Sequence, residues 1–175
     1  MADFTIAVNK VLKNEGGYVN DKSDSGGATN YGISLSFAKG VYPNWTEEDI
    51  KNLTTESAIQ IYKREFWNKG RYGEISNQRV ANYVFDCAVN HGIPQANKFL
   101  QRAVMAVDTN HLSVEDDGVI GNITLSRVNS AEIDNLALWC CMKAIRADFF
   151  RRIVDRKPSQ SRFLIGWLRR AYEKL

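Results

Sequence analysis

The chain has 175 residues, of which 44% are hydrophobic and 25% charged, a composition typical of a globular protein and not of a disordered or fibrous one. Its uncharged apolar runs are far shorter than the roughly 20 residues that span a bilayer. The segment Met1–Phe4 lacks the basic and apolar parts of a secretion signal, so we expect synthesis in a cytoplasm. The net charge of +3 is uneven, because residues 143–175 hold ten Lys/Arg and three Asp/Glu, a net +7 that leaves −4 elsewhere. This basic stretch fits a solvated helix face, a contact with anionic wall polymer or a contact with anionic membrane.

The spacing of apolar residues predicts a first helix over residues 3–14, which Gly16 and Gly17 end. The segment 20–30 is rich in Gly, Ser, Asn and Asp, which predicts turns and a short irregular hairpin. Further helices are expected in this order: from Thr46, from Thr54 through Phe66, over 80–91, over 95–107, over 122–128, from Ser130 to about Val154, and over 162–174.

Nearly every predicted segment is helical and only one is β, so the expected fold class is mainly α with a small irregular hairpin. The sequence has no internal repeat and no long linker. Gly92, Ile93 and Pro94 form the best boundary, which predicts an N-terminal lobe over 1–93 and a C-terminal helical lobe over 94–175. The boundary is short, so we expect the two lobes to pack into a single compact unit.

The sequence lacks the residue patterns that metal, cofactor and nucleic-acid binding require. His91 and His111 have no third ligand at metal spacing, so neither a metal site nor another cofactor is expected. Cys87, Cys140 and Cys141 are interpreted as buried small hydrophobes in a reducing compartment. A nucleic-acid partner is not expected, because the basic residues are confined to one end and no recognition motif is present.

Glu15 is the first candidate for catalysis. It follows Phe4 by eleven residues and therefore falls on the same helical stripe as Val8 and Val11. An ionised, unpaired carboxylate is costly there, so desolvation should raise the pKa of Glu15, as a general acid near neutral pH requires. The alternative is that Glu15 turns to solvent or pairs with a nearby lysine.

Asp24 is the second candidate, nine residues further on in a glycine-bordered polar turn. A hairpin after the first helix would bring it across a cleft from Glu15, and two carboxylates in unequal environments are the pattern of glycoside hydrolysis. The Thr29 hydroxyl would then orient Asp24 or a water molecule. The alternative for Asp24 is an Asx-turn, in which its side chain bonds its own backbone.

Candidate substrate contacts come from one helix face and from aromatic residues. Tyr83, Asp86 and Asn90 share a face at i, i+3 and i+7. If this face lines the cleft, Asp86 and Asn90 bind sugar hydroxyls or acetamido groups; otherwise the face supports the loop that carries Asp24. Of the aromatic residues, Tyr31 and Trp67 are assigned to substrate, and at most one or two of the whole aromatic set are expected in a groove. That set comprises Tyr18, Tyr31, Trp45, Trp67 and Tyr72.

These residues also carry a family resemblance. The ordered strings are Glu15-Gly16-Gly17-Tyr18, Asn20-Asp21, Asp24, Gly26-Gly27, Thr29, Tyr31-Gly32-Ile33, Phe66-Trp67, Arg71-Tyr72, Asp86 through Gly92, Asp117 through Thr124, and Phe163 through Trp167. Together they resemble glycoside hydrolase family 108, the muramidases of phage endolysins and of prophages in Gram-negative hosts. The resemblance covers essentially the whole chain, and its second half is similar to the family's peptidoglycan-binding portion.

The resemblance implies a lysozyme-like fold and cleavage of the β-1,4 bond between N-acetylmuramic acid and N-acetylglucosamine, with Glu15 as the acid. Eight residues separate Glu15 from Asp24, as in phage-type lysozymes, but four instead of five separate Asp24 from Thr29. The alternatives are a lytic transglycosylase and a non-catalytic wall-binding module. The implied partner is the peptidoglycan glycan strand, bound by a monomer that acts in the periplasm after its release. We also expect the basic C-terminal helices to contact anionic membrane or lipid A.

Overall fold

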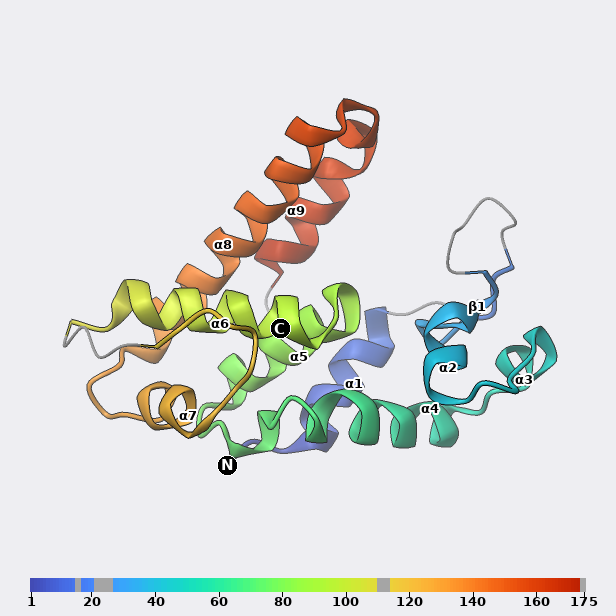
Figure 1. The fold of residues 1–175 in the computed structure, drawn as a ribbon, viewed down its shortest axis with the longest axis horizontal. Helices are drawn as coiled ribbons and strands as arrows, with labels where there is room; N and C mark the ends of the chain where they lie inside the picture. Colours follow the sequence, from blue (N-terminus) through green and yellow to red (C-terminus); the bar gives the residue numbers. More distant parts are fainter. Residues whose placement is uncertain (15–16, 21–26, 110–113, 174–175) are drawn as a thin grey trace. The chain divides into compact units, whose positions relative to one another are not determined.

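The computed structural model describes residues 1–14, 17–20, 27–109 and 114–173. The described residues are mostly helical, and their one sheet is a pair of two-residue antiparallel strands, which confirms the mainly α fold class (Figure 1). No helix in these ranges is both long enough and apolar enough to cross a membrane.

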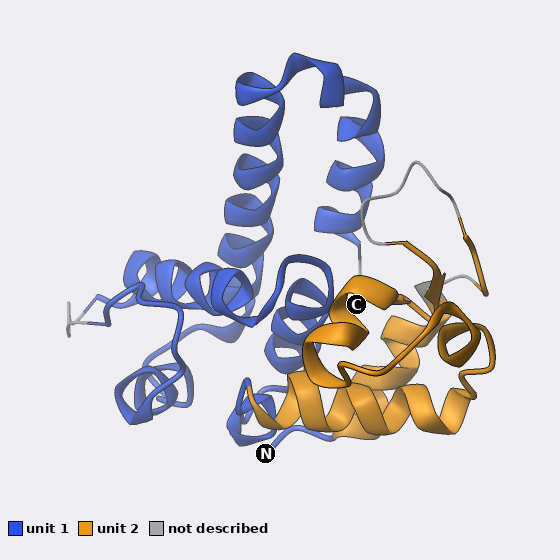
Figure 2. Cartoon of the chain, turned by 45° about the vertical axis from the view of Figure 1, so that its right-hand side comes forward, with its two compact units in different colours: residues 1–3, 70–175 blue, residues 4–69 orange. Residues whose placement is uncertain are grey.

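The chain divides into two compact units, coloured separately in Figure 2. Unit 2 comprises residues 4–69, and unit 1 comprises residues 1–3 together with 70–175. The division therefore falls at residue 70, and the helices before and after Gly92 pack against each other within unit 1. The division into functional lobes at residue 93 stays a prediction.

Unit 2 contains four helices, one hairpin and one π-helical segment in its described part. These are α1 (Phe4–Asn14), β1 (Thr29–Asn30), β2 (Ile33–Ser34), α2 (Leu35–Val41), α3 (Glu47–Lys51), α4 (Thr55–Tyr62) and η1 (Lys63–Asn68). The first helix buries Ala7, Val8 and Val11, so its predicted apolar stripe is confirmed. The predicted starts at Thr46 and Thr54 are confirmed as the N-caps of α3 and α4. Helix α2 was not predicted.

Aromatic side chains hold η1 in place within unit 2. Phe66 stacks on Phe37 with ring centroids 4.9 Å apart, and Trp67 meets Phe4 edge-on at 5.6 Å. Glu65 is buried beside them and forms an ion pair with Lys69, which holds the pKa of that carboxyl below its usual range. A buried carboxylate needs such a partner to stay ionised.

Unit 1 contains five α-helices and two short 3-10 segments in its described part. These are η2 (Tyr72–Glu74), α5 (Gln78–His91), α6 (Ile93–Val107), α7 (Asn122–Val128), α8 (Asn135–Arg156), η3 (Pro158–Phe163) and α9 (Leu164–Tyr172). Helix α6 packs on both α5 and α8, and η3 turns the chain so that α9 returns alongside α8 (Figure 1). The α8–α9 contact buries Ala147, Phe150 and Ala171, with Trp167 stacked on Phe150 at 5.3 Å.

Several helix boundaries differ from those predicted, and α4 ends at Tyr62 and not at Phe66, because residues 63–68 are π-helical. Helix α8 is capped by Asp134, whose carboxylate accepts hydrogen bonds from the backbone N–H groups of Leu136 and Ala137, so the expected start at Ser130 was wrong. Helix α6 begins at Ile93, because Pro94 fits the first helical turn, where its missing N–H is not needed. The last predicted helix is shorter, since residues 158–163 form 3-10 turns.

The turn before α7 is fixed by two buried amide side chains of α6. Asn97 donates a hydrogen bond to the Gly118 carbonyl at 3.0 Å, and the Gly118 N–H donates to Gln101 Oε1 at 2.9 Å. Gly118 itself has a φ of +86°, and a Cβ there would lie 2.9 Å from the Pro94 carbonyl oxygen. Glycine is therefore required at this position.

Gly118→Ala is expected to destabilise the protein by about 1–3 kcal/mol, because the left-handed backbone and the contact with Pro94 both resist a side chain. Gly166→Ala in α9 is the matched control. Nothing lies within 4 Å of a Cβ at Gly166, so alanine there should be neutral or add up to about 1 kcal/mol. Urea unfolding of both variants tests this, and equal stabilities would contradict it.

Candidate active site

A small hairpin is present over residues 29–34, at the end of the predicted segment 20–30 and just beyond it, and it pairs with the segment that follows α1; residues 21–26 of the predicted segment lie outside the described residues. Thr29 and Asn30 pair with Ser34 and Ile33, and two backbone hydrogen bonds of 2.8 Å join Val19 to Thr29. Two of the predicted catalytic residues, Glu15 and Asp24, lie outside the described residues. By sequence, Asp24 falls between the paired residues Val19 and Thr29.

Thr29 lies on β1, where its hydroxyl donates a 3.2 Å hydrogen bond to the Gly27 carbonyl. Its predicted role toward Asp24 stays a prediction. The turn between the strands uses Tyr31 and Gly32 with φ values of +49° and +75°. Two consecutive positive φ values are typical of the tight turns that match the twist of a hairpin.

Tyr31 is anchored at both ends. Its carbonyl accepts a 2.6 Å hydrogen bond from the Tyr62 hydroxyl, and its own hydroxyl accepts one of 3.1 Å from Thr55. The buried Asn30 amide also donates to the Ile50 carbonyl at the end of α3. The hairpin is therefore held in a fixed position on α3 and α4. The predicted contact of Tyr31 with substrate stays a prediction.

Trp67, the second aromatic residue assigned to substrate, is only 5% exposed and packs against Phe4. In the structure it is a packing residue of unit 2, and its predicted role with substrate stays a prediction. Tyr72 is completely buried. Trp45, by contrast, is half-buried and lines a cavity of about 510 Å³ between α2, α3 and α4.

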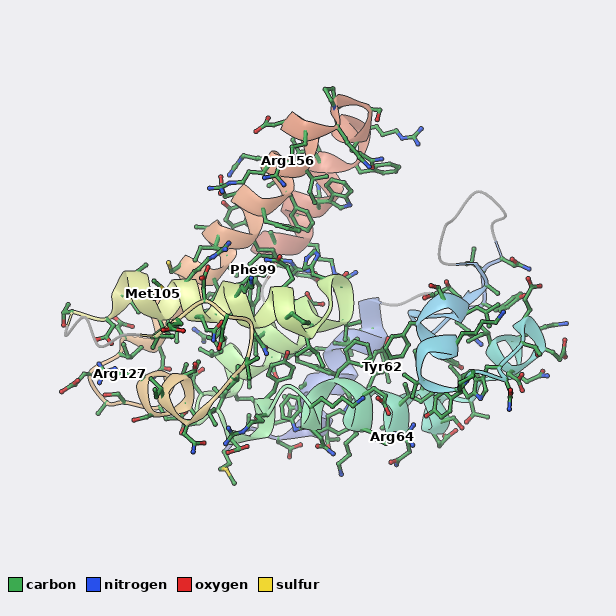
Figure 3. All side chains as sticks on the ribbon, viewed as in Figure 1. Tyr62, Arg64, Phe99, Met105, Arg127 and Arg156 are labelled. Atoms are coloured by element: carbon green, nitrogen blue, oxygen red, sulfur yellow. The ribbon has the colours of Figure 1, made fainter. Side chains whose placement is uncertain are left out.

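This cavity has an aromatic wall. Tyr42 and Trp45 stack with centroids 4.5 Å apart and planes 13° apart, and the Arg64 guanidinium lies over Tyr42 (Figure 3 labels Arg64). Leu53 and Ile61 add apolar surface. Polar groups complete the lining: Asp49, Asn52, Ser57 and Gln60. Aromatic faces beside amides and hydroxyls are chemically suited to a sugar ring. The sequence pattern did not show that these residues line one cavity.

In unit 1, Asp86 has the contacts of a structural ion pair. Its side chain is 1% exposed, and its oxygens accept hydrogen bonds from Arg146 at 2.7 Å and Arg170 at 3.0 Å. Asn90 donates to the Asp86 carbonyl one helical turn back at 2.7 Å. The substrate roles of Asp86 and Asn90 stay predictions, while both carboxylate oxygens of Asp86 are already bound by guanidinium groups.

Hydrogen bonds from side chains of α5 and α8 hold α9 in place. The Tyr83 hydroxyl donates a 2.7 Å hydrogen bond to the Ala171 carbonyl, and Lys143 donates one of 3.1 Å to the Tyr172 carbonyl. Arg146, which is completely buried, also lies over the Tyr83 ring at 5.5 Å. These contacts join α5, α8 and α9 around a buried charge.

His91 lies next to this cluster and is held neutral. Its Nε2 accepts a 3.2 Å hydrogen bond from Arg146, so that nitrogen carries no proton. Burial lowers the pKa of His91 to about 3, and the charge of Arg146 contributes in the same direction. The unfolded chain takes up this proton near pH 6.5, so between about pH 6.5 and 3 the unfolded state binds more protons.

Stability should therefore fall as the pH drops below about 6.5, by up to about 1.4 kcal/mol per pH unit from His91 alone. His91→Gln keeps an acceptor for Arg146 and removes the titration. We expect urea midpoints of the variant to decline less between about pH 7 and about pH 5 than those of the wild type. Parallel declines would contradict a neutral, half-buried His91.

The three cysteines differ in burial. Cys87 is completely buried, and desolvation raises the pKa of its thiol to about 12, so it is inert at neutral pH. Cys141 is half-buried and Cys140 is exposed, so the expectation that all three are buried was wrong. Among the described residues, no group of three or more His, Cys, Asp or Glu side chains could hold a metal ion.

Comparison with known proteins identifies both halves. The "Glycosyl hydrolase 108" family model matches residues 8–92, and the "Predicted Peptidoglycan domain" model matches residues 95–172. No curated protein sequence matches the chain significantly. Among solved structures, the chain is similar to that of Brucella abortus SagA, with 30% identity and a TM-score of 0.79 over 96% of this chain and 88% of the other.

The fold and the two matches define a hydrolytic enzyme of the cell wall, a glycosidase that acts on peptidoglycan and binds it. The chain belongs to the glycosyl hydrolase 108 family.

Proposed function

We propose that the protein is an endolysin that hydrolyses the β-1,4 bond between N-acetylmuramic acid and N-acetylglucosamine and thereby lyses the host cell. Glu15 protonates the glycosidic oxygen. Asp24, or a water molecule that Asp24 and Thr29 position, meets the developing oxocarbenium ion on the opposite face of the sugar. The protein is made in the cytoplasm and reaches the wall of the periplasm after its release.

The observation that carries this proposal is the burial pattern of α1. Residues Ala7, Val8 and Val11 are buried, and in the sequence Glu15 follows Val11 by four residues, which is the spacing of that stripe. We expect such a position at the end of an apolar stripe to keep a general acid protonated. The pairing of Val19 with Thr29 adds support, because Asp24 lies between these two paired residues in the sequence.

The products of digestion test this function. Purified, lipid-free peptidoglycan is digested with the full chain, and the fragments are analysed by mass spectrometry. Reducing N-acetylmuramic acid ends are expected. Anhydro ends would instead identify a lytic transglycosylase and leave Asp24 without its role, and binding without cleavage would identify a wall-binding protein.

A further inference from the structure

A groove lies on the surface of unit 1 between α6 and α8. It encloses about 460 Å³, and every residue that lines it belongs to the part of the chain that matches the peptidoglycan domain. Its lining combines apolar, amide and charged side chains: Gln95, Phe99, Arg102, Ala144, Ile145, Asp148, Phe149, Arg152, Ile153 and Arg156. None of the predicted catalytic or substrate residues is among them, so this is a separate feature of the molecule.

The floor of the groove is apolar and rigid. Phe99 of α6 is completely buried, and Phe149 of α8 meets it edge-on with ring centroids 5.3 Å apart (Figure 3 labels Phe99). Both rings also contact the half-buried His91, and Phe149 contacts Phe150. The floor is therefore the outer surface of an aromatic cluster that is already packed without a ligand.

The rim of the groove is basic. Three arginines line it against one acidic residue, Asp148. Arg102 pairs with Asp116 at 2.6 Å and Arg152 pairs with Asp148 at 2.7 Å, and these side chains are about half exposed. Arg156 is exposed at the end of α8 and has no acidic partner within the described ranges (Figure 3). The groove therefore presents one guanidinium group whose charge is uncompensated.

Peptidoglycan offers two chemically different parts to such a groove. Its N-acetylated glycan is uncharged apart from the lactyl group, which is amide-linked where a peptide is attached. Its stem peptide carries several carboxylates and, in Gram-negative walls, the ammonium group of a diamino acid. Guanidinium groups bind carboxylates through paired, charge-assisted hydrogen bonds, and a carboxylate such as Asp148 is the matching acceptor for an ammonium group.

We propose that the groove between α6 and α8 binds the acidic stem peptide of peptidoglycan. Arg156 binds a stem carboxylate. When the peptide binds, the ion pair between Arg152 and Asp148 opens, so that Arg152 pairs with a second peptide carboxylate and Asp148 pairs with the peptide ammonium group. The aliphatic side chains of the peptide pack on the partly exposed Phe149 and Ile153, which the buried Phe99 supports from below. The inference rests on the peptidoglycan binding of this half, and it holds whichever glycan bond the other half cleaves.

The observations favour a peptide over an anionic membrane surface. The arginines surround a concave apolar floor, and an acidic residue and the half-buried amide Gln95 lie among them. A negatively charged bilayer surface would gain nothing from Asp148, whereas a peptide with charges of both signs uses every group of the lining.

The test uses the full chain and a soluble stem tetrapeptide of alanine, γ-linked D-glutamate, meso-diaminopimelate and D-alanine. Isothermal titration is expected to show binding by the wild type and an affinity at least about tenfold lower for Arg156→Gln, as the loss of a charge-assisted hydrogen bond predicts. Arg151→Gln is the matched control, because Arg151 is exposed on the same helix but does not line the groove. It removes the same charge and should leave the affinity unchanged. Circular dichroism confirms that both variants fold.

Two further measurements separate the alternatives. Sacculi stripped of their stem peptides by an amidase should bind less wild-type protein than intact sacculi, and Arg156→Gln should bind both equally. Equal losses in Arg156→Gln and Arg151→Gln, or no peptide binding by the wild type, would overturn the proposal. Weaker binding of Arg156→Gln to phosphatidylglycerol vesicles, with peptide affinity unchanged, would assign the groove to lipid phosphates instead. Failure of glycan cleavage with peptide binding intact would count against the proposed function alone.

Discussion

Glu15→Gln should lower the rate of peptidoglycan hydrolysis by about 10³-fold, within the range of about 10²–10⁴ that general acid catalysis contributes. Glutamine has nearly the same shape but cannot transfer a proton to the departing glycosidic oxygen. The measurement is the release of soluble fragments from purified, lipid-free peptidoglycan, with the reducing ends counted by mass spectrometry.

Two controls make this loss specific. Glu56→Gln changes an exposed glutamate in the first turn of α4 and should leave the rate as it is. Binding of Glu15→Gln to intact sacculi should match that of the wild type, because the change removes a proton donor and not a binding surface. A Glu15→Gln enzyme that keeps more than about a tenth of the wild-type rate would show that another group supplies the proton.

Asp86→Ala should be the most destabilising single change in unit 1. Within the described part of the chain, it removes the only carboxylate that pairs with the completely buried Arg146, and breaking one side of a buried ion pair costs about 3–5 kcal/mol. In a chain of this size, that loss corresponds to a fall in Tm of roughly 6–20 °C. Differential scanning calorimetry measures it directly.

Asp148→Ala is the comparison for this prediction. It also removes an aspartate that pairs with an arginine, but both side chains are more than half exposed and lie one helical turn apart on α8. Such surface pairs contribute little to stability. Similar falls in Tm for the two variants would mean that the contribution of the Asp86 ion pair to the stability of the protein does not depend on its burial.

The contrast between these aspartates shows where the sequence is informative. Asp86 was placed on the correct face of a correctly predicted helix, together with Tyr83. Its partners, Arg146 and Arg170, are 60 and 84 residues away, and no local spacing connects residues at such separations. The sugar contact of Asp86 stays a prediction from local spacing, whereas its ion pairs are long-range and could not be predicted in that way.

The same distinction between local and long-range contacts applies to the helix boundaries. Those fixed by local chemistry were predictable, such as the starts of α3 and α4 at Thr46 and Thr54. The segment before α8 offers both Ser130 and Asp134 as caps; in the structure the Ser130 hydroxyl accepts a hydrogen bond from the Glu132 N–H within a turn, and Asp134 caps the helix. Helix α2 has only seven residues, and its cap, Ser34, is also a strand residue, so neither periodicity nor capping marked it.

Helix α8 explains the error over the cysteines. Its buried face includes Lys143 and Arg146 along with Leu138, Met142 and Phe150, so hydrophobicity does not mark the inside of this helix. The prediction that every cysteine lies in the core therefore placed Cys140 on the buried face of α8, whereas it lies on the exposed face. The buried cations are compensated by Asp86 and by the Tyr172 carbonyl, which become visible only when α5 and α9 are in place.

The hydrogen bonds that hold α9 also have a consequence for the order in which the chain folds during synthesis. Residues 4–69 form a contiguous unit, which can fold while the rest of the chain is still being translated. Unit 1 joins residues 1–3 to later parts of the chain, and its buried Tyr83 and Lys143 donate hydrogen bonds to the carbonyl groups of residues 171 and 172. These two hydrogen bonds can therefore form only after α9 has been synthesised, so α5 and α8 reach their final packing late in the synthesis of unit 1.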